Sequence, residues 1–132
     1  MARSAQARFK VESWDEQTYA ELDEGRKLTR ASVSQAFTGE IEGSGAVEWL
    51  MCYRPDGTAS FVGLQRISGR VGERSGSFVL ETAGTFDGQE ASANMSVVPG
   101  SGTEDLSGLR GTGRFAAPHG SPATVVLDYE LQ

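Results

Sequence analysis

Apolar and polar residues alternate along much of the chain. Between residues 28 and 42, Ala31, Val33 and Phe37 share one side of an extended backbone, and mostly hydroxyl and charged residues occupy the other side. This period of two predicts a β-strand with one buried and one solvated face. Similar patterns predict seven further strands, over residues 7–13, 46–54, 58–71, 77–86, 89–98, 111–117 and 123–131.

Turn-forming residues separate these strands at short intervals. Pro55-Asp56-Gly57 suits a type I turn closed by a glycine, and Asp87-Gly88 favours a two-residue hairpin because that turn needs positive φ angles. Short connections favour an antiparallel meander, and closing the meander leaves no exposed sheet edge. We therefore predict an all-β fold, an eight-stranded antiparallel closed barrel, with an open sandwich as the alternative.

One segment, between Trp14 and Lys27, departs from the strand pattern because it is acidic and only weakly periodic. Asp15 can cap a helical turn that carries Tyr19 and Leu22 and stops at Gly25. We therefore expect at most one short helical turn in the fold.

Length and charge limit the classes of function. The 132 residues fit one domain, residues 1–132, which buries roughly two-thirds of the surface of its unfolded chain. A net charge of -6 opposes binding to nucleic acid or to an anionic membrane, because both require a basic face. Cys52 is the only cysteine, so we expect no internal disulfide, a buried and inert thiol, and a cytoplasmic location. No apolar run approaches the length of a membrane-spanning helix, so we also expect a soluble protein.

Four segments carry a resemblance to a known family: LTRAS (28–32), EWLMCYRPDGTASFVGLQR (48–66), SGSFVLETAGTFDG (75–88) and PGSGT (99–103). In this order they resemble a bacterial family of small proteins described only as a domain of unknown function, and the resemblance covers nearly the whole chain. Through that family it implies an allene-oxide-cyclase-like barrel, a fold also found in plant dirigent proteins. The hairpin 100–111 is similar to the small-residue hairpin of those barrels. No catalytic or binding residue of the cyclases matches a position here.

Candidate site residues follow from counting back from the turns. This places Trp49, Met51 and Tyr53 opposite Gly63, Phe61 and Ala59, and it places Gln65 opposite Glu81 with Asn94 beside it. A face that mixes aromatic rings with a carboxylate and two amides is typical of a ligand pocket. We predict Glu81 as a catalytic general base and the following as ligand-binding residues: Trp49, Met51, Tyr53, Phe61, Gln65 and Asn94.

The opposite strand face allows another interpretation. Leu50, Val62, Leu64, Phe78, Leu80, Met95 and Val97 form a face that resembles a packed core. If that face points inward, Glu81 is solvated, and Trp49 and Tyr53 form an exposed interaction patch. His119, between Pro118 and Pro122, is expected in a solvated turn.

Three functions remain open. The first is binding of a small apolar molecule in the barrel or at its mouth. The second is an enzyme of the cyclase or isomerase type that acts on a reactive apolar substrate. The third is a filled barrel that serves as an oligomerising scaffold. We expect no cofactor and no metal, and a homodimer is the ordinary expectation for a small soluble protein that self-associates.

Overall fold

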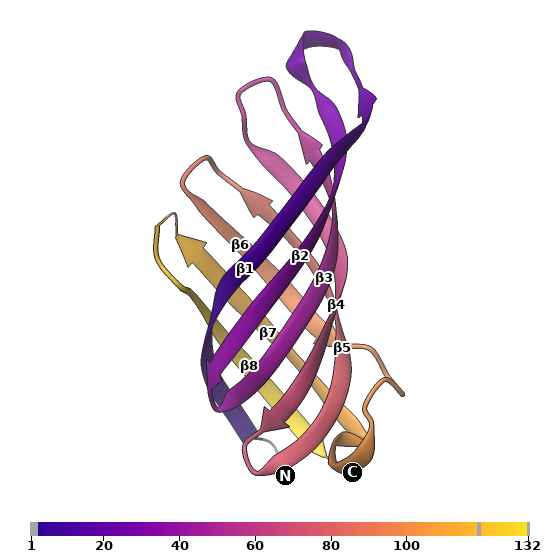
Figure 1. Cartoon of the computed structure of the whole chain (residues 1–132), viewed down its shortest axis with the longest axis vertical. Helices are drawn as coiled ribbons and strands as arrows, with labels where there is room; N and C mark the ends of the chain where they lie inside the picture. Colours follow the sequence, from indigo (N-terminus) through magenta and orange to yellow (C-terminus); the bar gives the residue numbers. More distant parts are fainter. Residues whose placement is uncertain (1–2, 119, 132) are drawn as a thin grey trace.

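Eight antiparallel strands form a closed barrel in the computed structural model, which describes residues 3–118 and 120–131 (Figure 1). Each strand pairs with the next, and β8 closes the ring on β1, from Arg3 opposite Tyr129 to Phe9 opposite Ala123. The strands are β1 (Arg3–Glu21), β2 (Lys27–Gly39), β3 (Ile41–Tyr53), β4 (Ala59–Val71), β5 (Arg74–Phe86), β6 (Glu90–Val97), β7 (Leu109–Pro118) and β8 (Ala123–Leu131). The predicted closed barrel is confirmed, and the open sandwich is wrong.

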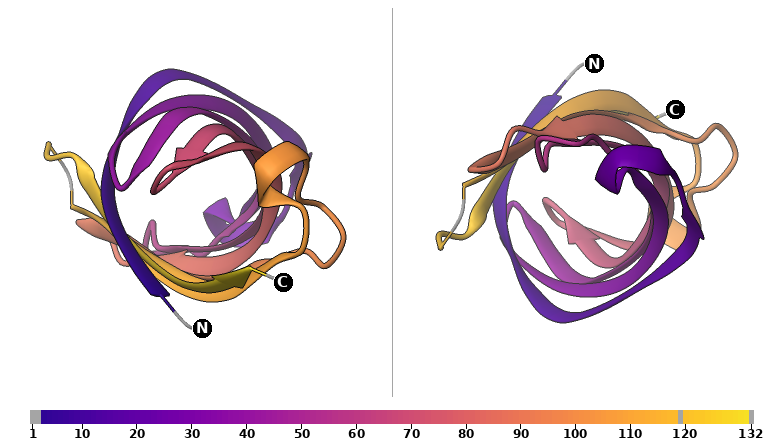
Figure 2. Two further views of the ribbon diagram at one scale, coloured as in Figure 1. Left: turned by 90° about the horizontal axis from the view of Figure 1, so that it is seen from below. Right: turned by 90° about the horizontal axis from the view of Figure 1, so that it is seen from above.

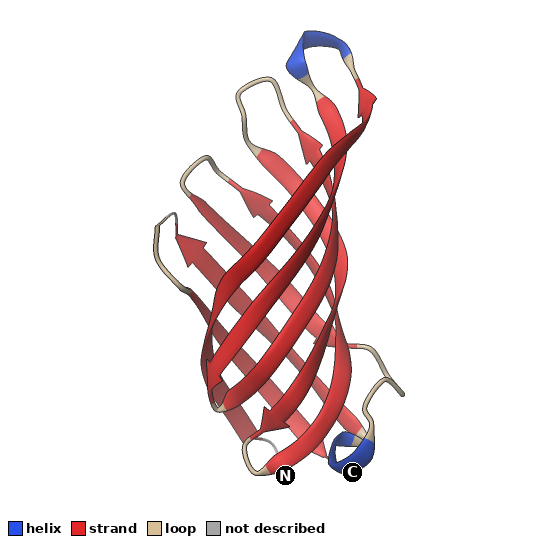
Figure 3. Cartoon of the chain, in the orientation of Figure 1, coloured by secondary structure: helices blue, strands red, loops and turns tan. Residues whose placement is uncertain are grey.

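Strand structure dominates the described residues (Figure 3). The exceptions to strand and loop are two short 3-10 turns, η1 (Asp23–Gly25) and η2 (Glu104–Leu106). Neither is long or apolar enough to span a membrane as a helix. His119 lies outside the described residues.

The segment between Trp14 and Lys27 is not a helical turn that begins at Asp15. Instead β1 continues to Glu21, and only the tip of the β1–β2 hairpin forms the 3-10 turn η1. The pairing of β1 with β2 is interrupted by register shifts between Val11 and Ser13 and between Thr18 and Ala20. These irregularities break the alternation of the sequence, and they explain why the pattern alone does not indicate a strand.

The two ends of the barrel differ (Figures 1 and 2). The hairpins at one end step downward from the tall β1–β2 hairpin to the low β7–β8 hairpin, so the tallest strand stands beside the lowest. Above Phe9, β1 pairs with β2 but has no pairing to β8. We call this stepped end the mouth.

The opposite end is filled by aliphatic side chains. The large, fully buried residues there include Ile41, Ile67, Leu109 and Leu127, together with Leu106 of η2. η2 belongs to the long β6–β7 connection, which packs on β5 through hydrogen bonds between Thr103 and Ser77. The closed end is therefore a packed core, and unfilled space inside the barrel lies toward the mouth.

Candidate functional site

The candidate site is an apolar cavity of about 250 Å³ inside the barrel, toward the mouth. Its walls come from β1 to β7, and polar atoms contribute little to them. The lining residues are Phe9, Val11, Trp14, Val33, Gln35, Trp49, Met51, Tyr53, Phe61, Phe86, Ala91, Phe115 and Ala117. Aromatic rings and two alanines, Ala91 and Ala117, thus meet at this end of the barrel.

Four aromatic rings form a continuous group within the cavity walls. Trp49 and Phe61 make an edge contact at a centroid distance of 4.9 Å, and Phe115 stacks on Phe61 at 6.4 Å. Phe9 makes an edge contact with Phe115 at 5.5 Å. These are favoured aromatic geometries, so the rings hold one another in place and give the cavity a rigid apolar wall.

Gly63 allows the Trp49 ring to lie against the neighbouring strand. The two residues are directly opposite in the β3–β4 pair, and both face the barrel interior. A Cβ atom on Gly63 would stand 2.6 Å from Cε3 of the indole and would overlap the backbone oxygen of Glu48. The missing side chain therefore provides the space that Trp49 occupies.

A hydrogen-bonded carboxylate stands at the mouth. Glu16 of β1 accepts hydrogen bonds from the hydroxyls of Thr29 (2.6 Å) and Tyr53 (2.7 Å) at Oε2, and from the Trp14 indole (3.0 Å) at Oε1. It thereby links three strands, and two of its partners, Trp14 and Tyr53, line the cavity. The Nζ atom of Lys27 lies 5.0 Å from the centre of the Tyr53 ring.

These contacts shift two pKa values in opposite directions. Burial raises the pKa of Glu16, but hydrogen bonds from Thr29, Tyr53 and Trp14, with a smaller effect of the Lys27 charge, outweigh it and leave the pKa below 4.5. Burial, followed by the hydrogen bond to Glu16 and its negative charge, raises the pKa of Tyr53. At neutral pH the mouth therefore carries an ionised carboxylate beside a protonated phenol.

A second polar group lies deeper in the barrel. The side chains of Gln35 and Gln65 are both almost fully buried, and the amide of Gln65 donates a hydrogen bond to Oε1 of Gln35. Gln35 also lines the cavity. The hydroxyl of Thr82 is buried without a hydrogen-bond partner among the described residues. The interior thus combines apolar walls with a few polar groups, as small-molecule sites do.

The predicted pairing of β3 with β4 is confirmed. Trp49, Met51 and Tyr53 lie opposite Gly63, Phe61 and Ala59, as the turn between β3 and β4 predicted. The predicted residues that line the cavity are Trp49, Met51, Tyr53 and Phe61. Trp49 is buried and Tyr53 half-buried, so the alternative in which they form an exposed patch is wrong.

The predicted partners of Gln65 are wrong by one position. Gln65 lies opposite Leu80, and Glu81 lies opposite Leu64. The reason is a tight turn at Gly72 and Glu73, which sets a register one residue away from the expected one and reverses the faces of β5 relative to β4. Gln65 therefore points into the barrel, whereas the Glu81 side chain is exposed on the outer surface and has no access to the cavity.

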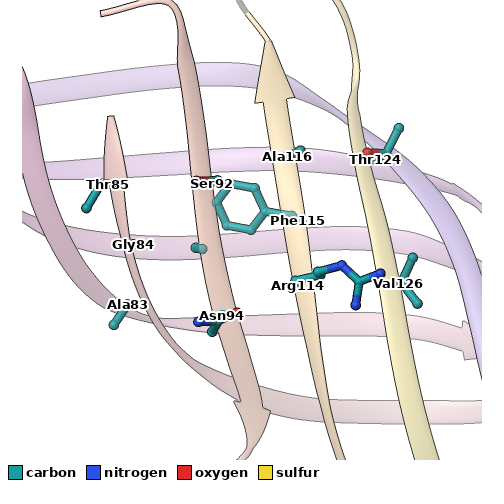
Figure 4. A pocket seen from close by; sticks show the side chains of 11 residues that line it. Ala83, Gly84, Thr85, Ser92, Asn94, Arg114, Phe115, Ala116, Thr124 and Val126 are labelled. Carbon is teal, nitrogen blue, oxygen red and sulfur yellow. The ribbon is translucent and has the colours of Figure 1, made fainter. Parts of the chain in front are cut away.

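Asn94 and Glu81 lie on the same face of the sheet, as expected, but this face is the outer surface of the barrel. Asn94 lies in an outer hollow of about 540 Å³ across β5 to β8, where Arg114 is its cross-strand neighbour (Figure 4). Exposed short side chains such as Ala83, Ser92 and Thr124 give this hollow its shape. It is open to solvent and lacks the aromatic enclosure of the inner cavity.

The face predicted as a uniform core is divided between inside and outside. Phe78, Leu80, Met95 and Val97 are buried, but Leu50, Val62 and Leu64 are about half exposed on the outer surface. Cys52, on the same outer side of β3, is exposed, so the prediction of a buried thiol is wrong. Within the described residues, no group of three or more histidine, cysteine, aspartate or glutamate side chains is arranged to hold a metal ion.

The sequence interpretation did not assign Glu16 or Trp14 to the ligand site. Gln35 was also missed, although it has the same parity as Val33 and Phe37 and so shares their inward side. No comparable signal marks Glu16, because the register shift after Val11 changes which residues of β1 face inward.

Comparison with known proteins supports this architecture. A crystal structure of a protein with unknown function from the DUF3224 family of Shewanella oneidensis MR-1 is similar to the present fold, with a TM-score of 0.85 and 25% sequence identity over 100% of this chain and 99% of that one. No curated protein matches the sequence. The family model described as "Protein of unknown function (DUF3224)" matches residues 5–129. The chain therefore belongs to the DUF3224 family.

Proposed function

We propose that this protein binds a small, apolar, preferably aromatic molecule in the cavity at the mouth of the barrel. The observation that carries the proposal is the space of about 250 Å³ walled by Phe9, Trp49, Phe61 and Phe115. Water in such a space gains few hydrogen bonds, and a ligand that buries apolar surface there is favoured by the hydrophobic effect.

The cavity volume sets the size of the ligand. An apolar cavity of about 150 Å³ accommodates benzene. The present cavity, at about 250 Å³, is somewhat larger and suits a compact bicyclic molecule such as a naphthalene derivative. The side chains of Gln35 and Tyr53 supply hydrogen-bonding groups that can orient such a ligand.

Binding takes precedence over catalysis because the general base expected from the sequence is absent from the cavity. Glu81 lies on the outer surface, so a cyclase or isomerase mechanism that depends on it has no support. A scaffold with a filled barrel has less support than a binding protein, because the barrel retains an unfilled cavity. A cytoplasmic location, with Cys52 kept reduced, is part of the proposal.

Isothermal titration calorimetry with 2-naphthylmethanol tests the proposal. Ala91 is half-buried in the cavity wall, whereas the next residue, Ser92, is exposed on the outer face. Ala91→Phe fills the cavity and should weaken binding at least about tenfold, and Ser92→Phe adds the same ring outside and should leave the affinity unchanged. Melting temperatures close to that of the wild type establish that both variants fold.

Two results would refute the proposal. One is the absence of measurable binding of both 2-naphthylmethanol and its amine counterpart, 2-naphthylmethylamine, to the folded wild-type protein. The other is equal affinity in the wild type and Ala91→Phe, because a ligand that ignores the filled cavity must bind elsewhere.

A further inference from the structure

The Glu16 carboxylate adds a negative charge beside the walls of the cavity. Glu16 is half-buried and contacts two lining residues, Trp14 and Tyr53. The two ion pairs that the described residues form, Arg30 with Glu48 and Arg70 with Glu42, do not include it. Its negative charge therefore has no basic side chain within ion-pairing distance in the described structure.

The hydrogen bonds of Glu16 leave acceptor capacity on one oxygen. A carboxylate offers about four acceptor positions, two on each oxygen. Thr29 and Tyr53 donate to Oε2, whereas Trp14 alone donates to Oε1. The remaining position is on the oxygen bonded to Trp14, whose ring lines the cavity and is 48% exposed. Oε1 of Glu16 therefore keeps one free acceptor position beside Trp14, a residue of the cavity wall.

The surroundings of Glu16 favour a positive charge. Residues 10–30, which include the β1–β2 hairpin, carry six acidic and four basic side chains. The faces of aromatic rings attract cations. The structure already contains one example, since the Lys27 ammonium stands over the Tyr53 ring with 5.0 Å to its centre.

We infer that the ligand of this cavity is a small apolar amine, whose aromatic or aliphatic body occupies the cavity and whose ammonium group donates to Glu16. This inference rests on the proposed binding function and specifies the chemistry of its ligand. A charge-assisted hydrogen bond is roughly twice as strong as a neutral one, and it is further strengthened where water is partly excluded. The carboxylate should therefore separate amines from neutral molecules of the same shape.

The test compares three probes of one shape at pH 7: 2-naphthylmethylamine, 2-naphthylmethanol and 2-naphthoic acid, each titrated by calorimetry. We expect the amine to bind about tenfold more tightly than the alcohol and the acid to bind most weakly. Glu16→Gln should lower the affinity for the amine about tenfold and leave that for the alcohol within about twofold. Higher salt concentration should weaken the binding of the amine, leave that of the alcohol unchanged, and strengthen that of the acid because it screens the repulsion from Glu16.

A matched control separates the local contact from the general charge of the hairpin. Asp15 is adjacent to Glu16, but it pairs with Ser32 on the outer side of the barrel and is exposed. Asp15→Asn removes the same charge and should leave the affinity for the amine almost unchanged. Far-UV circular dichroism and thermal unfolding of both variants verify that the β1–β2 hairpin remains folded.

Titration with the alcohol distinguishes a failure of the amine preference from a failure of the binding function. Equal binding of amine and alcohol to the wild type would overturn the inference and leave the binding function intact. Equal loss of amine affinity in Asp15→Asn and Glu16→Gln would also overturn it, because a long-range field would then explain the preference. Failure of both probes to bind would remove the proposed function itself, and the inference with it.

Discussion

Replacing Gly63 with alanine tests whether one missing side chain shapes the cavity. The added Cβ would lie 2.6 Å from Cε3 and 3.1 Å from Cζ3 of Trp49, whereas carbon atoms in contact are ordinarily about 3.5 to 4.0 Å apart. It would also overlap the backbone oxygen of Glu48, which cannot rotate away. The β3–β4 pair must therefore separate locally, and the indole must move by about 1 Å.

Forcing extra volume into a packed site costs about 1 to 3 kcal/mol, so we expect Gly63→Ala to lower the free energy of unfolding by about 2 kcal/mol. For a domain of this size the dependence of that free energy on urea is about 2 kcal/mol per molar, so the urea midpoint should fall by about 1 M. Displacement of Trp49 also moves its contact with Phe61, now at 4.9 Å between centroids, and should reduce the affinity for 2-naphthylmethanol.

Urea unfolding followed by far-UV circular dichroism measures the first effect, and calorimetry measures the second. Val62→Ala is the control, because Val62 adjoins Gly63 in the sequence but is 51% exposed on the outer face. It should change the midpoint much less and leave the affinity unaltered. A Gly63→Ala variant with the midpoint and affinity of the wild type would show that Trp49 is not confined by the neighbouring strand.

Three other predictions concern polar groups of the barrel. Gln35→Leu should lower the free energy of unfolding, measured by urea unfolding, by about 1 to 3 kcal/mol, because it leaves the Gln65 amide buried without a partner. The double variant Gln35→Leu with Gln65→Leu should recover much of this loss. If the effects of the two substitutions are additive instead, the pairing of the two amides is contradicted. The pKa of Glu16 is held below 4.5, so its stabilising contribution is present above the unfolded-state pKa and is lost as the pH falls through the pKa of the folded state. The difference in unfolding free energy between the wild type and Glu16→Gln should therefore shrink on acidification below about pH 4.5. A difference that grows over that range would contradict the assigned hydrogen bonds. The Cys52 thiol should react with Ellman's reagent in the native protein without denaturant, and a reaction that requires urea would place the side chain inside.

The strands of the barrel and their meander order follow from local sequence patterns. The Pro55-Asp56-Gly57 turn fixes the pairing of β3 with β4, and from it the inward positions of Trp49 and Phe61 follow by simple counting. These elements are predictable because alternation and turn chemistry act over a few neighbouring residues. Two of the four rings of the aromatic wall, Trp49 and Phe61, can therefore be derived from the sequence.

Counting back from a turn does not predict the register of β4 with β5. The sequence between residues 71 and 77 has several turn-forming candidates, and the structure uses Gly72 and Glu73, with Val71 opposite Arg74. A difference of one residue in a hairpin inverts the faces of the following strand. Because of this one-residue difference in register, Glu81 lies on the outer surface and not in the expected pocket. The choice among turn candidates depends on which face of β5 gains more by burial, which is a property of the whole barrel.

The charged part of the site depends on an irregularity of β1 that alternation does not reveal. Phe9 and Val11 lie opposite inward residues of β2, and regular alternation would then place Trp14 and Glu16 outside. The register shift after Val11 adds one residue to β1, so Trp14 comes to lie opposite the buried Val33. Such bulges are common where a strand has a neighbour on only one side, which is the condition of β1 above Phe9. The apolar walls thus arise from regular strands, whereas the carboxylate reaches the mouth because the closure of the barrel leaves β1 free to bulge.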